Sequence, residues 1–199
     1  LIALSMKLMG HWALPIFFVI LMLTQFAFKR YAAIRGTYRQ TIRSLARVTE
    51  VAGYTTTGHA RRVCDTSVAV GRELGLSEKR LLDLEYAALM HDLGQLSLVD
   101  PIPQGATALA EPDEQRRLAE KGAEVIRQTG VLDRVAAIVE RQAEPYRRPG
   151  EATDPSLPLE SRIVRAANAF DDLSGGSSDA GPRLAALEQL RLAMAYDYD

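Results

Sequence analysis

The sequence predicts an all-α protein in which an N-terminal transmembrane helix is followed by one helical domain. Two patterns carry this prediction. Residues 8–28 form an uncharged, strongly apolar run between Lys7 and Lys29. From Thr55 onwards, apolar residues recur at intervals of three and four, the spacing of an amphipathic helix, and no strand-like alternation of useful length interrupts them. With 199 residues, the chain has room for a single domain beside the apolar segment.

The apolar run has the length of a membrane span. At about 1.5 Å per residue, a helix over residues 8–28 is about 30 Å long, which matches the hydrocarbon core of a bilayer. A signal peptide or a buried core helix would be the competing interpretation. A signal peptide has an apolar stretch of about 7–15 residues, however, and no small-residue cleavage site follows Phe28. We therefore expect a membrane segment at residues 1–28, with His11 and Trp12 at its interface.

The segment after the apolar run is basic. No acidic residue occurs in it before Glu50, and its charged side chains are Lys29, Arg30, Arg35, Arg39, Arg43 and Arg47. The positive-inside rule then predicts a cell-membrane protein with its C-terminal part in the cytoplasm. We expect residues 29–52 to form a basic juxtamembrane helix, whose arginines either rest on anionic headgroups or are simply solvated.

A second side of this helix carries a short seam with alternating steps of three and four residues. Its members are Tyr38, Thr41, Leu45, Val48 and Ala52. Such a seam is typical of paired helices. We therefore expect two partners for this part of the chain, the membrane and a second copy that forms a homodimer through the juxtamembrane helix.

Residues 53–199 are expected to fold as a helical domain. The second of its helices can be capped by Ser77, Gly75 is suited to the left-handed position that follows a helix, and the third helix closes near Gly130. A proline-rich loop separates the fourth helix from the fifth. The expected helices cover residues 58–74, 77–94, 113–130, 131–139, 159–173 and 183–194.

Composition excludes several classes of protein. The 24 basic and 25 acidic side chains nearly balance, which argues against binding to a nucleic acid polymer. The single cysteine, Cys64, excludes an internal disulfide framework and any metal site built from several cysteines. The chain has only 3 histidines.

His59 and the adjacent pair His91 and Asp92 are the candidate chemical groups. Imidazole nitrogen and carboxylate oxygen together suit Mn, Fe or Zn in a hydrolytic site. Because the helix ends near Gly94, the neighbouring His and Asp can both face one ion. Taken alone, buried structural histidines are the more frequent explanation of such a pattern.

Several blocks of sequence give this pattern more weight, because they occur in the same order in a known family. They resemble the HD superfamily of metal-dependent phosphohydrolases and, more closely, its HD-GYP branch, whose known members hydrolyse cyclic di-GMP. The blocks are residues 57–63 (TGHARRV), 73–77 (ELGLS), 87–94 (AALMHDLG), 122–126 (GAEVI), 138–141 (IVER) and 162–171 (RIVRAANAFD).

The resemblance implies metal ligands at His59, His91, Asp92 and Asn168, with Asp92 also catalytic. Asn168 stands where the wider superfamily has an aspartate. The family's lysine and further histidines are replaced, and the Gly-Tyr-Pro signature has no equivalent. The replacing residues are Gln95, Leu118, Gln142 and Ala143.

A site with several metals therefore lacks its imidazoles. The resemblance implies at most one divalent ion, Mn, Fe or Zn, which is weakly held or absent, because a neutral amide brings no charge to offset desolvation of the ion. Asp171, three residues beyond Asn168, would either replace it as a ligand or be an ordinary polar residue near a helix end.

We expect a membrane-anchored cytoplasmic signalling domain of the HD-GYP type that has lost most of its catalytic ligands and binds a nucleotide or a protein partner. The alternative is an active mononuclear phosphohydrolase or phosphodiesterase that uses the remaining His-His-Asp site. Whether the chain is an enzyme is left open by the sequence.

Overall fold

The computed structural model describes residues 10–148, 150–194 and 196–199, without the side chains of residues 11, 35, 38, 39 and 104. In this part of the chain every regular element is a helix, apart from an isolated bridge between Met194 and Tyr198. The predicted all-α class is therefore confirmed. The chain divides into two compact units, residues 1–41 and residues 42–199.

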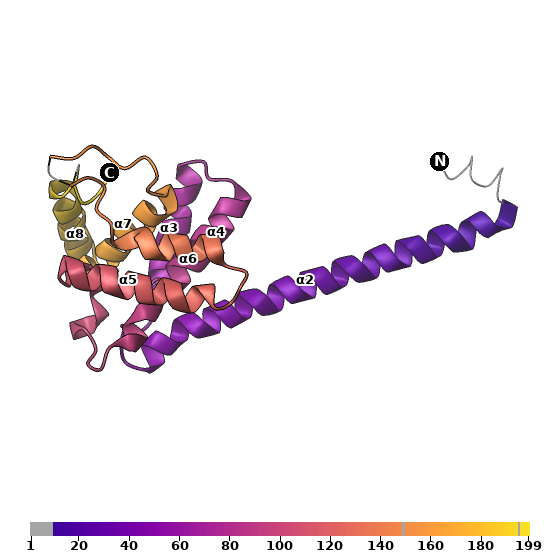
Figure 1. Cartoon of the computed structure of the whole chain (residues 1–199), viewed down its shortest axis with the longest axis horizontal. Helices are drawn as coiled ribbons and strands as arrows, with labels where there is room; N and C mark the ends of the chain where they lie inside the picture. The colour runs from indigo at the N-terminus through magenta and orange to yellow at the C-terminus, as the bar shows by residue number, and fades with distance from the viewer. Residues whose placement is uncertain (1–9, 149, 195) are drawn as a thin grey trace. The chain divides into compact units, whose positions relative to one another are not determined.

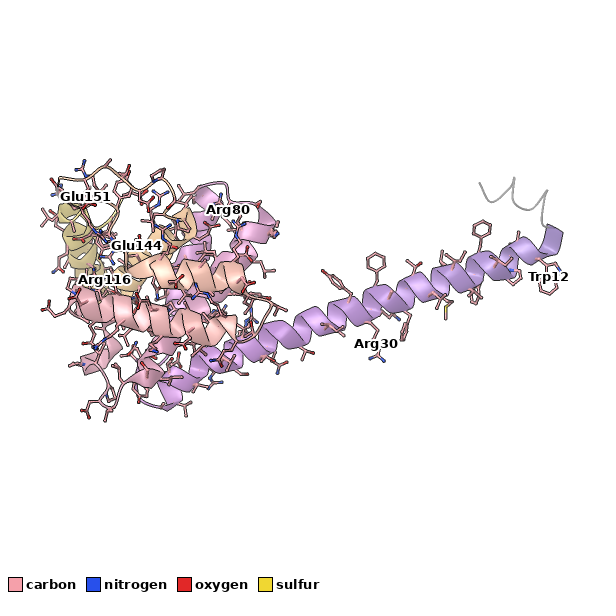
Figure 2. All side chains as sticks on the ribbon, in the orientation of Figure 1. Trp12, Arg30, Arg80, Arg116, Glu144 and Glu151 are labelled. Atoms are coloured by element: carbon pink, nitrogen blue, oxygen red, sulfur yellow. The ribbon has the colours of Figure 1, made fainter. Side chains whose placement is uncertain are left out.

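The first unit consists of the short 3₁₀ turn η1 (Gly10–Trp12) and most of α2 (Ala13–Val51). Within α2, the segment Ala13–Ile34 has a mean hydropathy of 1.5 and is long and apolar enough to cross a membrane. Its side chains stand out along the helix in Figure 2, where Trp12 and Arg30 are labelled. Residues 1–9 of the predicted membrane segment lie outside the described residues.

α2 runs without interruption through the residues predicted as a juxtamembrane helix (Figure 1). Its C-terminal turns belong to the second unit, where Ile42, Ala46 and Thr49 are at most 4% exposed. Leu45 and Val48 of the predicted seam are 40% and 42% exposed. The buried side of the helix is therefore adjacent to the seam, and the homodimer stays a prediction.

The second unit contains the predicted helices, which are α3 (His59–Glu73), α4 (Glu78–Met90), α5 (Pro112–Arg127), α6 (Asp133–Glu140), α7 (Leu159–Ser174) and α8 (Ala180–Leu192). α3 packs on α4 and α7, and α5 lies beside α6 (Figure 1). Their apolar stripes meet in a core that includes Val63, Leu84, Ile126, Val139 and Val164, all almost completely buried. The boundaries predicted at residues 28 and 52 remain predictions.

A close backbone contact brings the end of α4 against α5. The short 3₁₀ helix η2 (Leu93–Ser97) follows α4, and its Gly94 approaches the backbone of α5 at Leu118 and Gly122. A Cβ atom on Gly94 would lie 1.9 Å from the Leu118 carbonyl oxygen, so a larger residue does not fit. This contact places His91 and Asp92, which lie between α4 and η2, in the interior of the domain.

Candidate metal centre

Three separate parts of the domain supply the predicted ligands. His59 is the first residue of α3, His91 and Asp92 lie between α4 and η2, and Asn168 lies on α7. At Asp92 the backbone has left the helical conformation, with φ −98° and ψ 6°. The turn allows the adjacent His91 and Asp92 side chains to face one point. All four residues are buried.

Three ligand atoms form a nearly equilateral triangle. His59 Nε2 lies 3.2 Å from His91 Nε2 and 3.2 Å from Asp92 Oδ2. His91 Nε2 lies 3.1 Å from Asp92 Oδ2. Ligand atoms about 2.1 Å from a metal, at angles of about 90–109°, are about 3.0–3.4 Å apart. The triangle thus has the size of one face of a metal coordination shell.

Asn168 extends this set on the side of His91, with its Oδ1 3.3 Å from His91 Nε2. Its orientation follows from its neighbours. Asn168 Nδ2 donates to Thr107 Oγ1 at 3.0 Å, and the Thr107 hydroxyl donates to Asp92 Oδ1 at 3.3 Å. Because the Asn168 amide nitrogen is engaged in this way, its oxygen is the atom that faces the imidazoles.

The hydrogen bonds of the two imidazoles decide which ring nitrogen carries the proton. His59 Nδ1 donates to Asp171 Oδ2 at 2.8 Å, and His91 Nδ1 donates to the Ala88 carbonyl oxygen at 2.8 Å. In the neutral tautomers, both Nε2 atoms then present lone pairs to Asp92 Oδ2. Polar partners of this kind orient the histidine ligands of metals in general.

The arrangement therefore gathers acceptor atoms and leaves them without a donor. Asp92 Oδ2 is buried and accepts no hydrogen bond from the residues that the structure describes. A buried acceptor without a partner is costly unless a cation or proton compensates it. The set of two imidazoles, one carboxylate and one amide fits a divalent metal ion in its chemistry and spacing.

The acidic groups around His59 attract a proton as well as a metal ion. Burial lowers the pKa of His59, but its hydrogen bond with Asp171 and the nearby charges of Asp92 and Asp172 outweigh that effect and raise the pKa from 6.5 to about 10. Burial raises the pKa of Asp92, but the adjacent imidazoles of His91 and His59 lower it overall. A proton on His59 and a metal ion at Nε2 would thus compete for the same lone pair.

A second layer of acidic residues surrounds His59. Arg62 binds both carboxylate oxygens of Asp171, and this contact, together with that of His59, outweighs burial and lowers the pKa of Asp171. Asp172 accepts a hydrogen bond from the Ala108 amide at 3.0 Å. Burial raises the pKa of Asp172 to about 6.

Asp171 has neither of the two roles considered from the sequence. It contacts Nδ1 of His59, on the side of the ring that faces away from the triangle, so it orients a predicted ligand. Sequence reasoning missed Arg62 and Thr107. The position of Arg62, three residues after His59 on the same face of α3, was a signal that could have found it, whereas nothing local marked Thr107.

A small cavity of about 40 Å³ opens beside the triangle. It contains the positions at which the resemblance leads one to expect further ligands. Its walls are formed by His91, Asp92, Gln95, Thr107, Ala108, Gln115, Leu118, Ala119, Gln142, Ala143, Arg165, Asn168 and Tyr198.

Two amides in this wall have different surroundings. Gln142 Nε2 donates to the carbonyl oxygen of His91 at 2.8 Å and so supports the turn that carries the ligands. Gln95 is fully buried, and its Oε1 accepts no hydrogen bond within the described part of the chain. The cavity therefore contains a second unpartnered acceptor beside the triangle.

Comparison with known proteins identifies the family. A stretch of 142 residues, 68% of the chain, is 30% identical to the cyclic di-GMP phosphodiesterase response regulator RpfG of Xanthomonas campestris pv. campestris (strain 8004). The stretch covers 38% of that relative, so the chain spans well under two thirds of its length. Residues 38–199 match the family model of the HD domain. The chain belongs to the HD domain family.

Proposed function

We propose that this chain is a membrane-anchored signalling protein whose cytoplasmic HD domain holds one divalent metal ion and binds a phosphate-containing nucleotide with little or no turnover. The observation that carries the proposal is the convergence of His59 Nε2, His91 Nε2, Asp92 Oδ2 and Asn168 Oδ1, which are all acceptors in the neutral tautomers of the two histidines. Four such atoms in a buried site require a positive charge.

The donor set suits Mn, Fe or Zn. When bound, such an ion would supply a Lewis acid and lower the pKa of a coordinated water. His59 and His91 would hold it through Nε2, while Asp92 would bring the one negative charge of the set. Asn168 is neutral and offsets none of the cation's desolvation, which supports weak retention of the ion.

Low turnover is proposed because the cavity offers no further strong ligands. Leu118 and Ala143 have no donor atoms, and the Gln142 amide is engaged with the His91 carbonyl. A cavity needs about 10–15 Å³ to hold one water, so the 40 Å³ beside the triangle has room for a few waters, and the base of a bound nucleotide would lie outside it. The relative's name supports cyclic di-GMP as the first nucleotide to test.

The anchor is proposed from α2. The segment Ala13–Ile34 is apolar and its side chains are largely exposed, while the basic residues that follow favour a cytoplasmic C-terminal domain. The exposed Leu45 and Val48 on the same helix support a homodimer contact there.

A mononuclear phosphohydrolase is the second candidate, and the size of the triangle is compatible with it. Asp92 would orient the attacking water, and the hydrogen bond from His91 Nδ1 to the Ala88 carbonyl oxygen would leave His91 Nε2 free for the ion. Both candidates need the same metal site, and they differ only in turnover.

The test uses the full chain in detergent micelles. The protein is loaded with Mn, Fe or Zn, freed of excess metal and analysed for metal by mass spectrometry, as wild type and as Asp92→Asn, with His11→Ala as the matched control at the histidine outside the domain. We expect about one metal per chain, lost in Asp92→Asn and kept in His11→Ala. A chain without metal would overturn the proposal.

Turnover then separates the two candidates. Cyclic di-GMP and bis(4-nitrophenyl) phosphate are offered to the metal-loaded chain. Binding of the nucleotide without hydrolysis supports the signalling domain, whereas hydrolysis that disappears in Asp92→Asn would replace it with the phosphohydrolase.

A further inference from the structure

Arg165 on α7 lines the same cavity as His91, Asp92 and Asn168. Its side chain is 15% exposed. Among the described residues of the cavity wall, Arg165 is the one with a permanent positive charge. The domain therefore presents a guanidinium beside the predicted metal ligands.

One edge of this guanidinium is anchored to the protein. Arg165 Nη1 donates to the Ala143 carbonyl oxygen at 3.0 Å and approaches Gln115 Oε1 at 3.4 Å. These contacts fix the plane of the group. Arginine presents its donors in a rigid fork that matches the oxygens of phosphate.

The other edge faces residues 196–199 at the C-terminal end. Arg165 Nε donates to the Asp197 carbonyl oxygen at 3.2 Å, and Nη2 lies 3.5 Å from Asp197 Oδ1. The Tyr198 ring, whose centroid is 5.6 Å from the guanidinium carbon, also forms part of the cavity wall. The carbonyl oxygen and the carboxylate of Asp197 thus occupy donors of Arg165 that an anion would use, and the Tyr198 ring lies against the face of the guanidinium.

This segment is held by backbone hydrogen bonds, by an ion pair between Asp199 and Arg162 and by a contact of Arg147 with the Tyr196 ring. The backbone amides of Tyr146 and Arg147 donate to the carbonyl oxygens of Asp197 and Tyr196, at 3.3 and 2.8 Å. The Asp197 side chain is 51% exposed, and ion pairs with exposed members contribute little to stability. Displacement of the Asp197 carboxylate from Arg165 therefore costs little.

We propose that Arg165 binds a phosphate group of the ligand in this cavity, and that Asp197 and Tyr198 occupy this place when no ligand is bound. The C-terminal segment then acts as an internal competitor, and its displacement enlarges the cavity. The proposal rests on the proposed function, because the metal site and Arg165 would hold the same phosphate.

The test measures binding of inorganic phosphate to the full chain in detergent micelles by isothermal titration calorimetry, with and without bound manganese. Asp197→Asn keeps the shape of the side chain and removes its charge. The matched controls are Glu188→Gln and Arg191→Gln, an exposed pair on α8 with a contact of 2.6 Å.

We expect Asp197→Asn to bind phosphate about two- to fivefold more tightly, the equivalent of one partly exposed ion pair. Arg165→Gln should bind at least about tenfold more weakly, because it loses charged hydrogen bonds. The double variant should be as weak as Arg165→Gln, since Asp197 competes only for Arg165. The two controls should leave the affinity unchanged.

An unchanged or weaker affinity in Asp197→Asn, in a chain that retains manganese, overturns this inference and leaves the metal site standing. If no manganese is retained, the proposed function fails, and the same order of affinities in the metal-free chain still supports Arg165 as an anion site. Should Arg165→Gln fail to fold, deletion of residues 196–199 gives the answer, since tighter phosphate binding is expected there too.

Discussion

Arg62 and Asp171 form a two-point ion pair, with Arg62 Nε 2.7 Å from Asp171 Oδ1 and Arg62 Nη2 2.8 Å from Asp171 Oδ2. The second oxygen also accepts the Nδ1 proton of His59 at 2.8 Å. The pair therefore determines which nitrogen of His59 is free for a metal, although neither residue lies in the triangle.

Removing the charge of Asp171 should weaken the metal site. We expect Asp171→Asn to lower metal affinity about 10- to 100-fold, because partners behind a ligand of this kind have effects of that size. Competition with a fluorescent metal chelator measures it. The matched control is Asp65→Asn, an exposed aspartate on α3, the helix that begins at His59, and it pairs with Arg61. An equal loss there would contradict the interpretation.

The pH dependence of the metal-free chain should follow His59. Its pKa is raised from 6.5 to about 10 in the folded protein, so its protonated form stabilises the fold fully below pH 6.5. This contribution is lost as the pH rises through about 10. Thermal unfolding of the second unit across this range should show a falling midpoint, and the fall should be absent in His59→Gln.

Metal binding should have the opposite pH dependence. A metal at His59 Nε2 displaces the proton, so its affinity rises with pH over the same range. The stabilisation of the chain by added manganese should be larger at about pH 8 than at about pH 6. An increase in midpoint that is the same at both values would show that the metal does not bind at His59.

A carboxylate in place of the Asn168 amide should lower the stability of the metal-free domain and raise its affinity for metal. Asn168→Asp would place a second negative charge near Asp92, which destabilises the metal-free domain by repulsion. With metal bound, the added charge offsets the cation's desolvation and tightens binding. Metal affinity and the unfolding midpoint, measured on the same preparation, check both signs. If Asn168→Asp lowers both the unfolding midpoint of the metal-free domain and the metal affinity, Asn168 Oδ1 does not face the ion.

The contact between η2 and α5 should tolerate no side chain at Gly94. Gly94→Ala places a Cβ 1.9 Å from the Leu118 carbonyl oxygen, and we expect it to destabilise the domain by about 1–3 kcal/mol or more. Gly181→Ala on α8 is the control, because its Cβ would meet no atom within 4 Å. Equal unfolding free energies for the two variants would contradict this account.

Much of the helical order could be read from local signals. Gly75 follows α3 with φ 73°, in the left-handed conformation predicted for it, and Leu76 N donates to the Gly71 carbonyl at 3.0 Å. α8 begins at Ala180, before the predicted residue 183. Pro182 obscured this start, although proline is compatible with the first turn of a helix.

The end of α2 shows where local patterns fail. Steps of three and four residues describe the predicted seam with Leu45 and Val48 and also the buried set Ile42, Ala46 and Thr49. Over so few turns, neighbouring faces of a helix give nearly the same pattern. Packing against the rest of the second unit selects the face that is buried.

The sequence by itself determined the all-α class, the apolar span and the candidates His59, His91 and Asp92, because each depends on local spacing or on a contiguous motif. The tertiary structure alone decided what these side chains face. The contacts of His59 with Asp171, of Asn168 with Thr107 and of Arg165 with Asp197 join residues far apart in the chain. Such contacts exist only after helices from distant segments have packed, since no local propensity encodes the direction in which a lone pair points.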